Sequence, residues 1–266
     1  MIYTMPVRYF KKLIKRLFSV LGLVLVSKKF WVSELGKSTL LPSLTFLLSL
    51  RAMNSIDVMP FVNYSKSQNF QDLYVLSELN LKTEGYFVDF GATNGIDFSN
   101  TFLLEEKFGW QGILAEPARC WHKDLHRNRP SAFIEELCIW TDSNLHLTFN
   151  ETVLRELSTL ETFSSLDSHR ELRKSGEKYE VTTISLVDLL DKHSAPRNID
   201  YLSIDTEGSE FEILNAFDFE KYSFSVITCE HNYTPAREKI YELLTSKGYI
   251  RKYENLSLWD DWYVKA

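Results

Sequence analysis

Short apolar runs alternate with amphipathic segments along most of this chain. The runs are rich in β-branched and aromatic residues and are bounded by turn-forming or charged residues, which is typical of strands. Between them, apolar residues recur at the spacing of one helix face. The pattern predicts strands at 86–90, 112–116, 132–140, 199–205 and 224–230, and helices at 67–79, 101–108, 118–127, 185–190, 210–217 and 235–247.

The order of these elements indicates the fold class. Strands that alternate with helices build a parallel sheet, so we expect a doubly wound, Rossmann-like α/β fold. The polar segment 141–180 interrupts the alternation and is expected to form a hairpin and a loop insert. Residues 249–266 resemble the two strands of a closing hairpin, and Ser185 followed by Asp188 predicts a capped helix start.

Four of the predicted strands end in a carboxylate, and these residues are Asp89, Glu116, Asp205 and Glu230. In a doubly wound sheet, the carboxyl ends of the parallel strands share one edge, and ligands bind there. We therefore expect all four acids to face one rim of the sheet.

The turn after the first strand has the sequence DFGATNG, with glycines at Gly91 and Gly95. A nicotinamide dinucleotide site would need G-x-G-x-x-G, which lets the backbone approach a pyrophosphate. A G-x-x-x-G turn preceded by Asp89 instead suits a cofactor without phosphate, such as S-adenosylmethionine (SAM), because a carboxylate favours its cationic end. Glu116, which ends the second strand, is placed to accept hydrogen bonds from both ribose hydroxyls. The alternative is an ordinary strand-to-helix turn.

Several sequence blocks resemble a known family. VDFGATNGIDFSNTFLLEEKFGWQGILAEP (88–117) and IDYLSIDTEGSEFEIL (199–214) are similar to core blocks of the FkbM family of SAM-dependent methyltransferases. SQNFQDLYV (67–75) resembles the helix that precedes these blocks, and DDWYV (260–264) resembles the last strand of the family. The resemblance thus runs from about residue 65 to the C-terminus, with the blocks in the family's order.

The resemblance implies a seven-stranded methyltransferase sheet, SAM as the cofactor, and usually a hydroxyl oxygen of a sugar, glycan or small molecule as the methyl acceptor. It does not identify the acceptor, because the family is diverse. Phe70, Gln71 and Thr93 depart from the residues that are more usual in the family at these positions.

The glycine turn and its surroundings supply the candidate cofactor-binding residues. For some of them a simpler role is open. Ala92 and Thr93 of the turn could contribute only their backbone, and Gln68 and Asp72 of the preceding helix could be solvated or could cap it. Asn100, which follows the turn, could only cap the next helix. We expect SAM contacts from Gln68, Asp72, Asp89, Gly91, Ala92, Thr93, Asn94, Gly95, Asn100, Glu116 and Pro117.

The candidate catalytic residues are Asp205, Glu207 and His231. Asp205 would orient the acceptor hydroxyl, take its proton, or bind a divalent metal ion, so it is also the candidate metal ligand. Glu207 either joins it or caps the following helix, and Glu210 is expected to point toward solvent or a neighbour. His231 is a candidate general base, because the pKa of histidine lies near neutral pH, although a lone histidine more often serves as a loop hydrogen-bond partner.

Composition narrows the partners and the compartment. The chain is 44% hydrophobic and 25% charged, so it can bury a sizeable core. Its net charge of -6 argues against nucleic acid as a partner, because phosphate binding needs a basic face. The three cysteines lie far apart and form no CxxC pair, which favours a reducing, cytoplasmic compartment.

The N-terminal segment differs from the rest of the chain. Residues 1–30 contain several Lys and Arg residues but no acid, and they surround the apolar run 17–26, which is too short to span a bilayer. We expect residues 1–54 to be a helical extension that contacts an anionic membrane surface at the inner face, and residues 55–266 to be the methyltransferase domain. A secretory signal, a helix packed on the domain and a frayed tail are the alternatives.

These observations predict a SAM-dependent methyltransferase, and more specifically an O-methyltransferase. Two other functions remain open at this stage. One is an NAD-dependent oxidoreductase on the same layered fold, although the glycine spacing argues against it. The other is a non-catalytic, SAM-binding scaffold protein.

Overall fold

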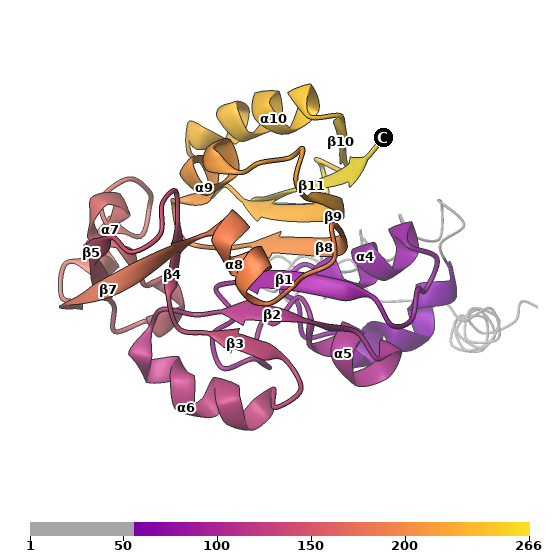
Figure 1. The fold of residues 1–266 in the computed structure, drawn as a ribbon, viewed down its shortest axis with the longest axis horizontal. Helices are drawn as coiled ribbons and strands as arrows, with labels where there is room; N and C mark the ends of the chain where they lie inside the picture. The colour runs from indigo at the N-terminus through magenta and orange to yellow at the C-terminus, as the bar shows by residue number, and fades with distance from the viewer. Residues whose placement is uncertain (1–55) are drawn as a thin grey trace, which may run out of the picture. The chain divides into compact units, whose positions relative to one another are not determined.

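The computed structural model describes residues 56–266 (Figure 1). The predicted extension, residues 1–54, and its boundary with the domain lie outside the described residues. Within 56–266, parallel strands and helices alternate as the sequence predicts, and the carboxyl ends of the parallel strands meet along one edge.

A seven-stranded sheet forms the centre of the described domain, in the order β10-β11-β9-β8-β1-β2-β3. β11 is antiparallel to both of its neighbours, and the other pairings are parallel. The chain leaves β1 toward β2 and β3, then returns to build β8 and β9 on the other side, so the switch point lies between β1 and β8. The strands are β1 Tyr86–Phe90, β2 Gln111–Ala115, β3 Phe133–Glu135, β8 Asn198–Ile204, β9 Ser223–Glu230, β10 Tyr249–Lys252 and β11 Asp260–Lys265.

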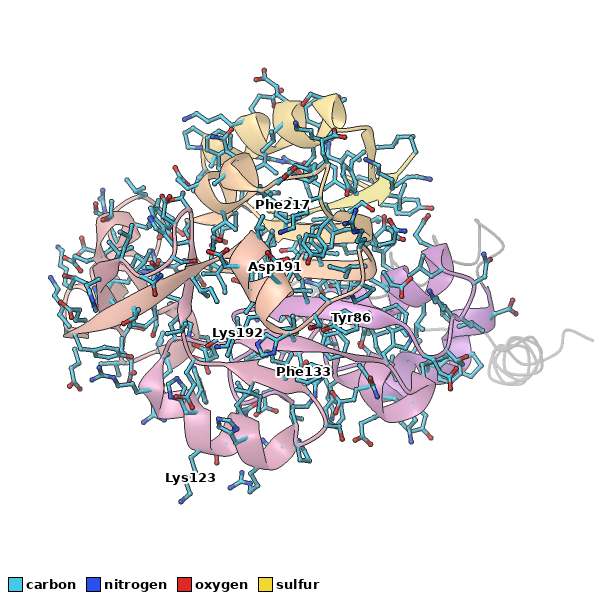
Figure 2. The ribbon with its side chains drawn as sticks, viewed as in Figure 1. Tyr86, Lys123, Phe133, Asp191, Lys192 and Phe217 are labelled. Atoms are coloured by element: carbon cyan, nitrogen blue, oxygen red, sulfur yellow. The ribbon has the colours of Figure 1, made fainter. Side chains whose placement is uncertain are left out.

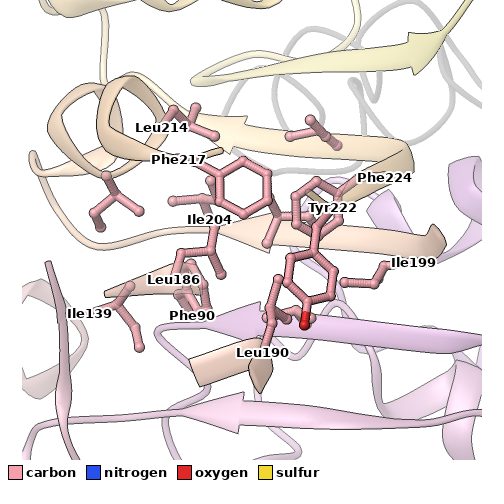
Figure 3. Packing of buried hydrophobic residues seen from close by; sticks show 14 of the residues in the cluster. Phe90, Ile139, Leu186, Leu190, Ile199, Ile204, Leu214, Phe217, Tyr222 and Phe224 are labelled. Atoms are coloured by element: carbon pink, nitrogen blue, oxygen red, sulfur yellow. The ribbon is translucent and has the colours of Figure 1, made fainter. Parts of the chain in front are cut away.

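Helices cover both faces of this sheet. On one face, apolar residues of α8, α9 and α10 pack with the sheet in one buried cluster that includes Tyr263 of β11. Figure 3 shows Ile204 and Leu214 in this cluster. Trp262 precedes Tyr263 on β11 and points to the opposite face, where Tyr74 of α4 stacks on it at a ring-centroid distance of 4.6 Å. The helices are α4 Gln71–Glu78, α5 Phe102–Phe108, α6 Arg119–Asn128, α8 Leu186–Lys192, α9 Glu210–Ala216 and α10 Ala236–Ser246, preceded by the 3₁₀ helix η2 Ile56–Tyr64.

The polar segment after β3 forms a second, four-stranded sheet in the order β4-β7-β5-β6. Its strands are β4 Cys138–Trp140, β5 His146–Glu151, β6 Thr159–Leu160 and β7 Glu177–Ser185. β5 and β7 pair antiparallel, as expected for the predicted hairpin, and between them lie η3 Arg155–Leu157, η4 Glu161–Phe163 and the short helix α7 Arg170–Arg173. We call residues 141–185 the insert.

The prediction of one strand over 132–140 is wrong. The run is divided between β3 in the large sheet and β4 in the small one. At the division, the carboxylate of Glu135 is buried, accepts from the backbone N–H of Leu137 at 3.3 Å, and forms an ion pair with Lys192 of α8 at 2.6 Å. Figure 2 labels Lys192 on α8 and Phe133 on β3. Nothing in the local pattern marks this turn, because its partner lies on a distant helix.

Candidate active site

A cavity of about 420 Å³ opens at the carboxyl ends of the central strands. Residues that end β1, β2, β8 and β9 or directly follow them line it, as expected for a doubly wound sheet. The cavity thus brings all four strand-end acids together. The sequence-predicted residues that line it are Gln68, Asp89, Gly91, Ala92, Thr93, Asn100, Glu116, Pro117, Asp205 and Glu207.

Asp72, Asn94, Gly95 and His231 do not line this cavity. The carboxylate of Asp72 is buried and accepts hydrogen bonds from the Ser65 hydroxyl at 2.7 Å and from the backbone N–H of Leu73 at 2.8 Å. The Oδ1 atom of Asn94 closes the glycine turn, because it accepts from the backbone N–H groups of residues 96 and 97. The structure therefore gives these two side chains local structural roles.

His231 is buried beside the cavity and is held by the backbone. Its Nδ1 accepts from the N–H of Tyr233 at 2.9 Å, so the imidazole proton resides on Nε2, which lies 3.8 Å from Asp261 Oδ1. Burial lowers the pKa of His231, which keeps the ring neutral near pH 7. A neutral, buried imidazole outside the cavity fits the loop hydrogen-bonding role better than the general base.

The two glycines of the turn serve different contacts. At Gly91 φ is +79°, and a Cβ atom would lie 2.0 Å from the carbonyl oxygen of Asp205. Only glycine allows the end of β1 to touch the loop after β8 in this way. At Gly95 φ is +80°, and a Cβ atom would lie 2.5 Å from Cγ of Arg129, so this glycine makes room for a side chain of the fold rather than for the cofactor.

Glu116 organises the half of the cavity next to the glycine turn. Its Oε2 accepts from the N–H of Thr93 and its Oε1 from the N–H of Ala118, each at 2.8 Å. Each carboxylate oxygen keeps a second lone pair, so the group can also accept from two ribose hydroxyls. Burial raises the pKa of Glu116 to about 7, and it raises the pKa of Asp89 to about 6.

The segment after the turn supplies one free acceptor. Ser99 Oγ accepts from the N–H of Phe102, the first residue of α5, at 3.1 Å, so this hydroxyl helps to cap the helix. Asn100 Nδ2 donates to Ser203 Oγ at 3.0 Å. Among the residues described, no partner is found for Asn100 Oδ1, although Asn100 lines the cavity. This oxygen fits the ammonium group of SAM.

These pKa values predict how cofactor binding depends on pH. We expect the affinity for SAM to fall as the pH drops through about 7, because Glu116 then becomes protonated in the free protein and must lose that proton to accept from the ribose. Glu116→Gln should weaken binding by about 1–3 kcal/mol and remove this step, leaving a step near 6 from Asp89. Titration calorimetry across this range tests both points, and a wild-type affinity independent of pH would contradict them.

The other half of the cavity contains a cluster of three acids. One carboxylate oxygen each from Asp205, Glu207 and Glu230 lies within 4.8 Å of the others. Burial and the neighbouring Asp260 raise the pKa of Asp205 to about 8, while a hydrogen bond with Glu230 opposes the rise. Burial and the negative charge of Asp205 also hold the pKa of Glu230 well above its ordinary value. Asp205 and Glu230 are hydrogen-bonded to each other and can therefore share a proton.

Glu207 is tied to the insert. Its Oε2 accepts from Arg173 Nη2 at 2.7 Å and from Asn232 Nδ2 at 3.1 Å, and its backbone has a φ of +59°. Arg173, whose side chain is fully buried, also donates to the carbonyl of Leu157 and to Asp167 Oδ2 at 2.8 Å each. These contacts fix the insert segment that lines this half of the cavity, so Glu207 positions the cavity wall.

Sequence reasoning missed Arg173 and Asn232. For Glu210 it left open a side chain that faces solvent or one that contacts a neighbour, and the structure shows the second. The partners of Arg173 lie far away along the chain, so no local pattern pointed to it. Glu210 is buried rather than solvated, since its Oε1 accepts from the backbone N–H groups of Thr206 and Gly208 at 2.9 and 3.0 Å and so holds the start of α9. The four-residue spacing from Thr206 to Glu210 does not match the three-residue spacing of a capping box, so no standard sequence signal pointed to these contacts.

A family model described as "Methyltransferase FkbM domain" matches residues 89–251, which is more than half of the chain. The chain belongs to the FkbM methyltransferase family. The match confirms the resemblance of the blocks 88–117 and 199–214 and identifies the chemistry as SAM-dependent methylation. The blocks 67–75 and 260–264 lie just outside the matched residues.

Solved structures of other methyltransferases resemble this FkbM protein distantly. Precorrin-6y C5,15-methyltransferase from Geobacter metallireducens is 13% identical over 73% of this chain and 87% of its own, with a TM-score of 0.41. A putative RNA methyltransferase from Pyrococcus horikoshii is 13% identical over 74% and 82%, with a TM-score of 0.37. The N-terminal domain of human METTL16, solved in complex with SAH, is 12% identical over 73% and 68%, with a TM-score of 0.36. Among curated proteins, no sequence matches the chain.

Proposed function

We propose that this FkbM protein transfers a methyl group from SAM to a hydroxyl oxygen of a sugar, glycan or small molecule. The observation that carries the proposal is the Asp205–Glu230 pair. It lies in the same cavity as Asp89 and Glu116, and the pKa of Asp205, about 8, suits the exchange of a proton near neutral pH.

Each half of the cavity has its own task. SAM, when bound, supplies an activated methyl group on a sulfonium sulfur. Asp89, Asn100 and Glu116 hold its polar parts on the side of the glycine turn. Asp205 in its ionised form, whose share grows as the pH rises toward about 8, would accept the proton of the acceptor hydroxyl. The walls of the cavity would exclude water and help to orient the hydroxyl oxygen toward the methyl group.

The alternative to direct proton transfer is an acceptor site that holds a divalent metal ion. Asp205, Glu207 and Glu230 offer three carboxylate oxygens, which are ligands that Mg²⁺ and Mn²⁺ prefer. However, one oxygen of Glu207 already accepts from the Arg173 guanidinium, whose positive charge opposes a cation at this place. We therefore favour direct proton transfer to Asp205.

An acceptor screen tests the function. The protein and methyl-labelled SAM are incubated with a panel of neutral glycans, sugar alcohols and small alcohols, and products are analysed by mass spectrometry. We expect a methylated product that resists mild base, as an ether does. Methylation of amines or carboxylates only would contradict O-methylation, and release of SAH with none of the panel methylated would leave the hydroxyl class without support. The family match favours methyl transfer over the NAD-dependent alternative, and the intact acid pair favours turnover over a scaffold role.

We also propose that the protein is cytoplasmic and that residues 1–54 attach it to the inner face of an anionic membrane. The basic residues around the apolar run 17–26 support this, because they would be attracted to anionic lipid. In the part of the chain that the structure describes, no helix is long and apolar enough to cross a bilayer.

Vesicle sedimentation tests the attachment. We expect the full chain to sediment with vesicles that contain anionic lipid and to stay in solution with neutral ones, while a truncation that starts at Ser55 stays in solution with both. The truncation should bind SAM as well as the full chain does. Equal sedimentation of both proteins, or of neither, would refute the membrane contact.

A further inference from the structure

Arg129 is a buried arginine behind the cofactor side of the cavity. It directly follows α6, and only 1% of its surface is exposed. Arginine is almost never buried to this extent unless it is fully paired. It does not line the cavity, and sequence reasoning gave it no role, so its contacts need an explanation.

The guanidinium group holds the glycine turn and the segment after it. Nη1 donates to the carbonyl oxygen of Gly95 at 3.0 Å and to Ser99 Oγ at 3.3 Å. Nε and Nη2 bind Oε2 of Glu105 on α5 at 2.8 and 2.6 Å. The neighbouring Asn128 also donates to the carbonyl of Asn94 at 2.9 Å, so the end of α6 captures two successive carbonyls of the turn.

The same guanidinium sets the direction of a hydrogen bond to Asp89. Nη1 and Nη2 both donate to Thr101 Oγ1 at 3.3 Å. Because arginine can only donate, the threonine hydroxyl accepts from it and directs its own proton elsewhere. Thr101 Oγ1 donates to Asp89 Oδ2 at 2.8 Å. Arg129 therefore reaches Asp89 through one hydroxyl, in addition to its direct charge attraction.

The shape of the turn is adapted to this arginine. Gly95 leaves the space that Cγ of Arg129 fills, since a Cβ atom there would lie 2.5 Å away. Gly95, the second glycine of the G-x-x-x-G turn, thus leaves space for the side chain of Arg129. Arg129 in turn donates a hydrogen bond to the carbonyl oxygen of Gly95.

We propose that Arg129 is a positioning residue for SAM: it fixes the turn 91–95 and, through Thr101, the orientation of the Asp89 carboxylate that faces the cofactor. The proposal rests on the assignment of this cavity to SAM. A purely structural role, in which Arg129 only neutralises Glu105 between α5 and α6, is the alternative that the test must separate.

Three variants separate the two roles. Arg129→Met keeps the aliphatic stem but removes all donors, and we expect it to weaken SAM and SAH binding by about 10- to 100-fold. It also leaves Glu105 as an unpaired charge, so stability falls. Adding Glu105→Gln removes that charge and should recover much of the stability without recovering the affinity. The control is Arg127→Met, because Arg127 is exposed and pairs with Asp124 and Asn128 on its own helix, and we expect it to bind SAM normally.

The pH profile of binding gives a readout that loss of packing alone would not change. Burial raises the pKa of Asp89, while the Thr101 hydroxyl, the Arg129 guanidinium and the Ser203 hydroxyl lower it. The other titratable groups that interact with Asp89 are Glu116, Tyr201 and Asp205, so Arg129 is the one cation among them. Without the guanidinium the pKa of Asp89 rises, so the pH below which binding weakens moves upward. Arg129→Lys keeps the charge but cannot bridge all its partners, so it should lose affinity while its profile stays near that of the wild type.

The profile is measured by calorimetry with SAH in the Glu116→Gln background, where the protonation step of Glu116 is absent. If the double variant Arg129→Met/Glu105→Gln binds SAH like the wild type, Arg129 is only structural. If the profile of Arg129→Met does not move, the link to Asp89 is wrong. If the wild type itself binds no SAH, the cofactor assignment fails, and that result is distinct from a failure of the role of Arg129.

Discussion

Asp205→Asn is expected to lower methyl transfer by about 10²- to 10⁴-fold, the usual contribution of a general base, while SAM affinity changes only several-fold. The substitution keeps the shape of the side chain but removes the group that takes the hydroxyl proton. It also leaves Asp89 and Glu116 in place on the cofactor side of the cavity. Steady-state turnover is measured with an acceptor from the screen, and SAH affinity by calorimetry.

His231→Gln is the matched comparison for Asp205→Asn. The imidazole is buried near the acid cluster but does not line the cavity, so this variant should turn over much faster than Asp205→Asn. The opposite ranking would make His231 the base and refute the assignment of Asp205. EDTA added to the wild type distinguishes the two versions of the acceptor site: retained activity supports direct proton transfer, and lost activity that Mg²⁺ or Mn²⁺ restores supports a metal ion.

Gly91→Ala is expected to abolish detectable SAM binding and to lower the free energy of unfolding by about 3 kcal/mol or more. The added Cβ atom would lie 2.0 Å from the Asp205 carbonyl oxygen, at a φ of +79° that disfavours L-residues. Neither the strand end nor the loop can shift without moving the cavity wall. Denaturant unfolding and calorimetry with SAH measure the two effects.

Gly109→Ala is the control for this glycine. Gly109 also has a positive φ, +67°, but a Cβ atom added there would have no atom of the described residues within 4 Å, apart from its chain neighbours. The substitution should cost only the conformational strain, about 1–2 kcal/mol, and leave SAM affinity unchanged. Equal losses in the two variants would mean that the contact between the turn and Asp205 has no special importance.

The central strands and their acids could be predicted from sequence because the signals are local. An apolar run that ends in a carboxylate marks the carboxyl end of a strand, and the layered fold then brings such ends to one edge. Asp89, Glu116, Asp205 and Glu230 were placed in this way, and the structure brings them to one cavity. The helix cap at Ser185 was equally local, and its hydroxyl accepts from the N–H of Asp188 at 3.1 Å.

The features that sequence did not predict depend on distant partners. Arg129 bonds to Gly95 and Arg173 bonds to Glu207, and the two residues of each pair lie 34 positions apart in the sequence. Such distant pairs produce no periodic pattern in the sequence. Gly95 matched the expected spacing for a cofactor turn, yet it serves the packing of an arginine. The strand predicted at 132–140 is divided because its first half pairs with β2 in the large sheet and its second half with β7 in the small one, and these partners are not visible in the local sequence.

Titration calorimetry of the full chain with SAH and with NAD, near pH 8, tests the central claim most directly. At this pH Asp89 and Glu116 are ionised, since their pKa values are about 6 and about 7. We predict that SAH binds at one site per chain, that Glu116→Gln weakens it, and that NAD gives no binding heat. Binding of NAD without binding of SAH, or SAH binding that Glu116→Gln leaves unchanged, would contradict the account.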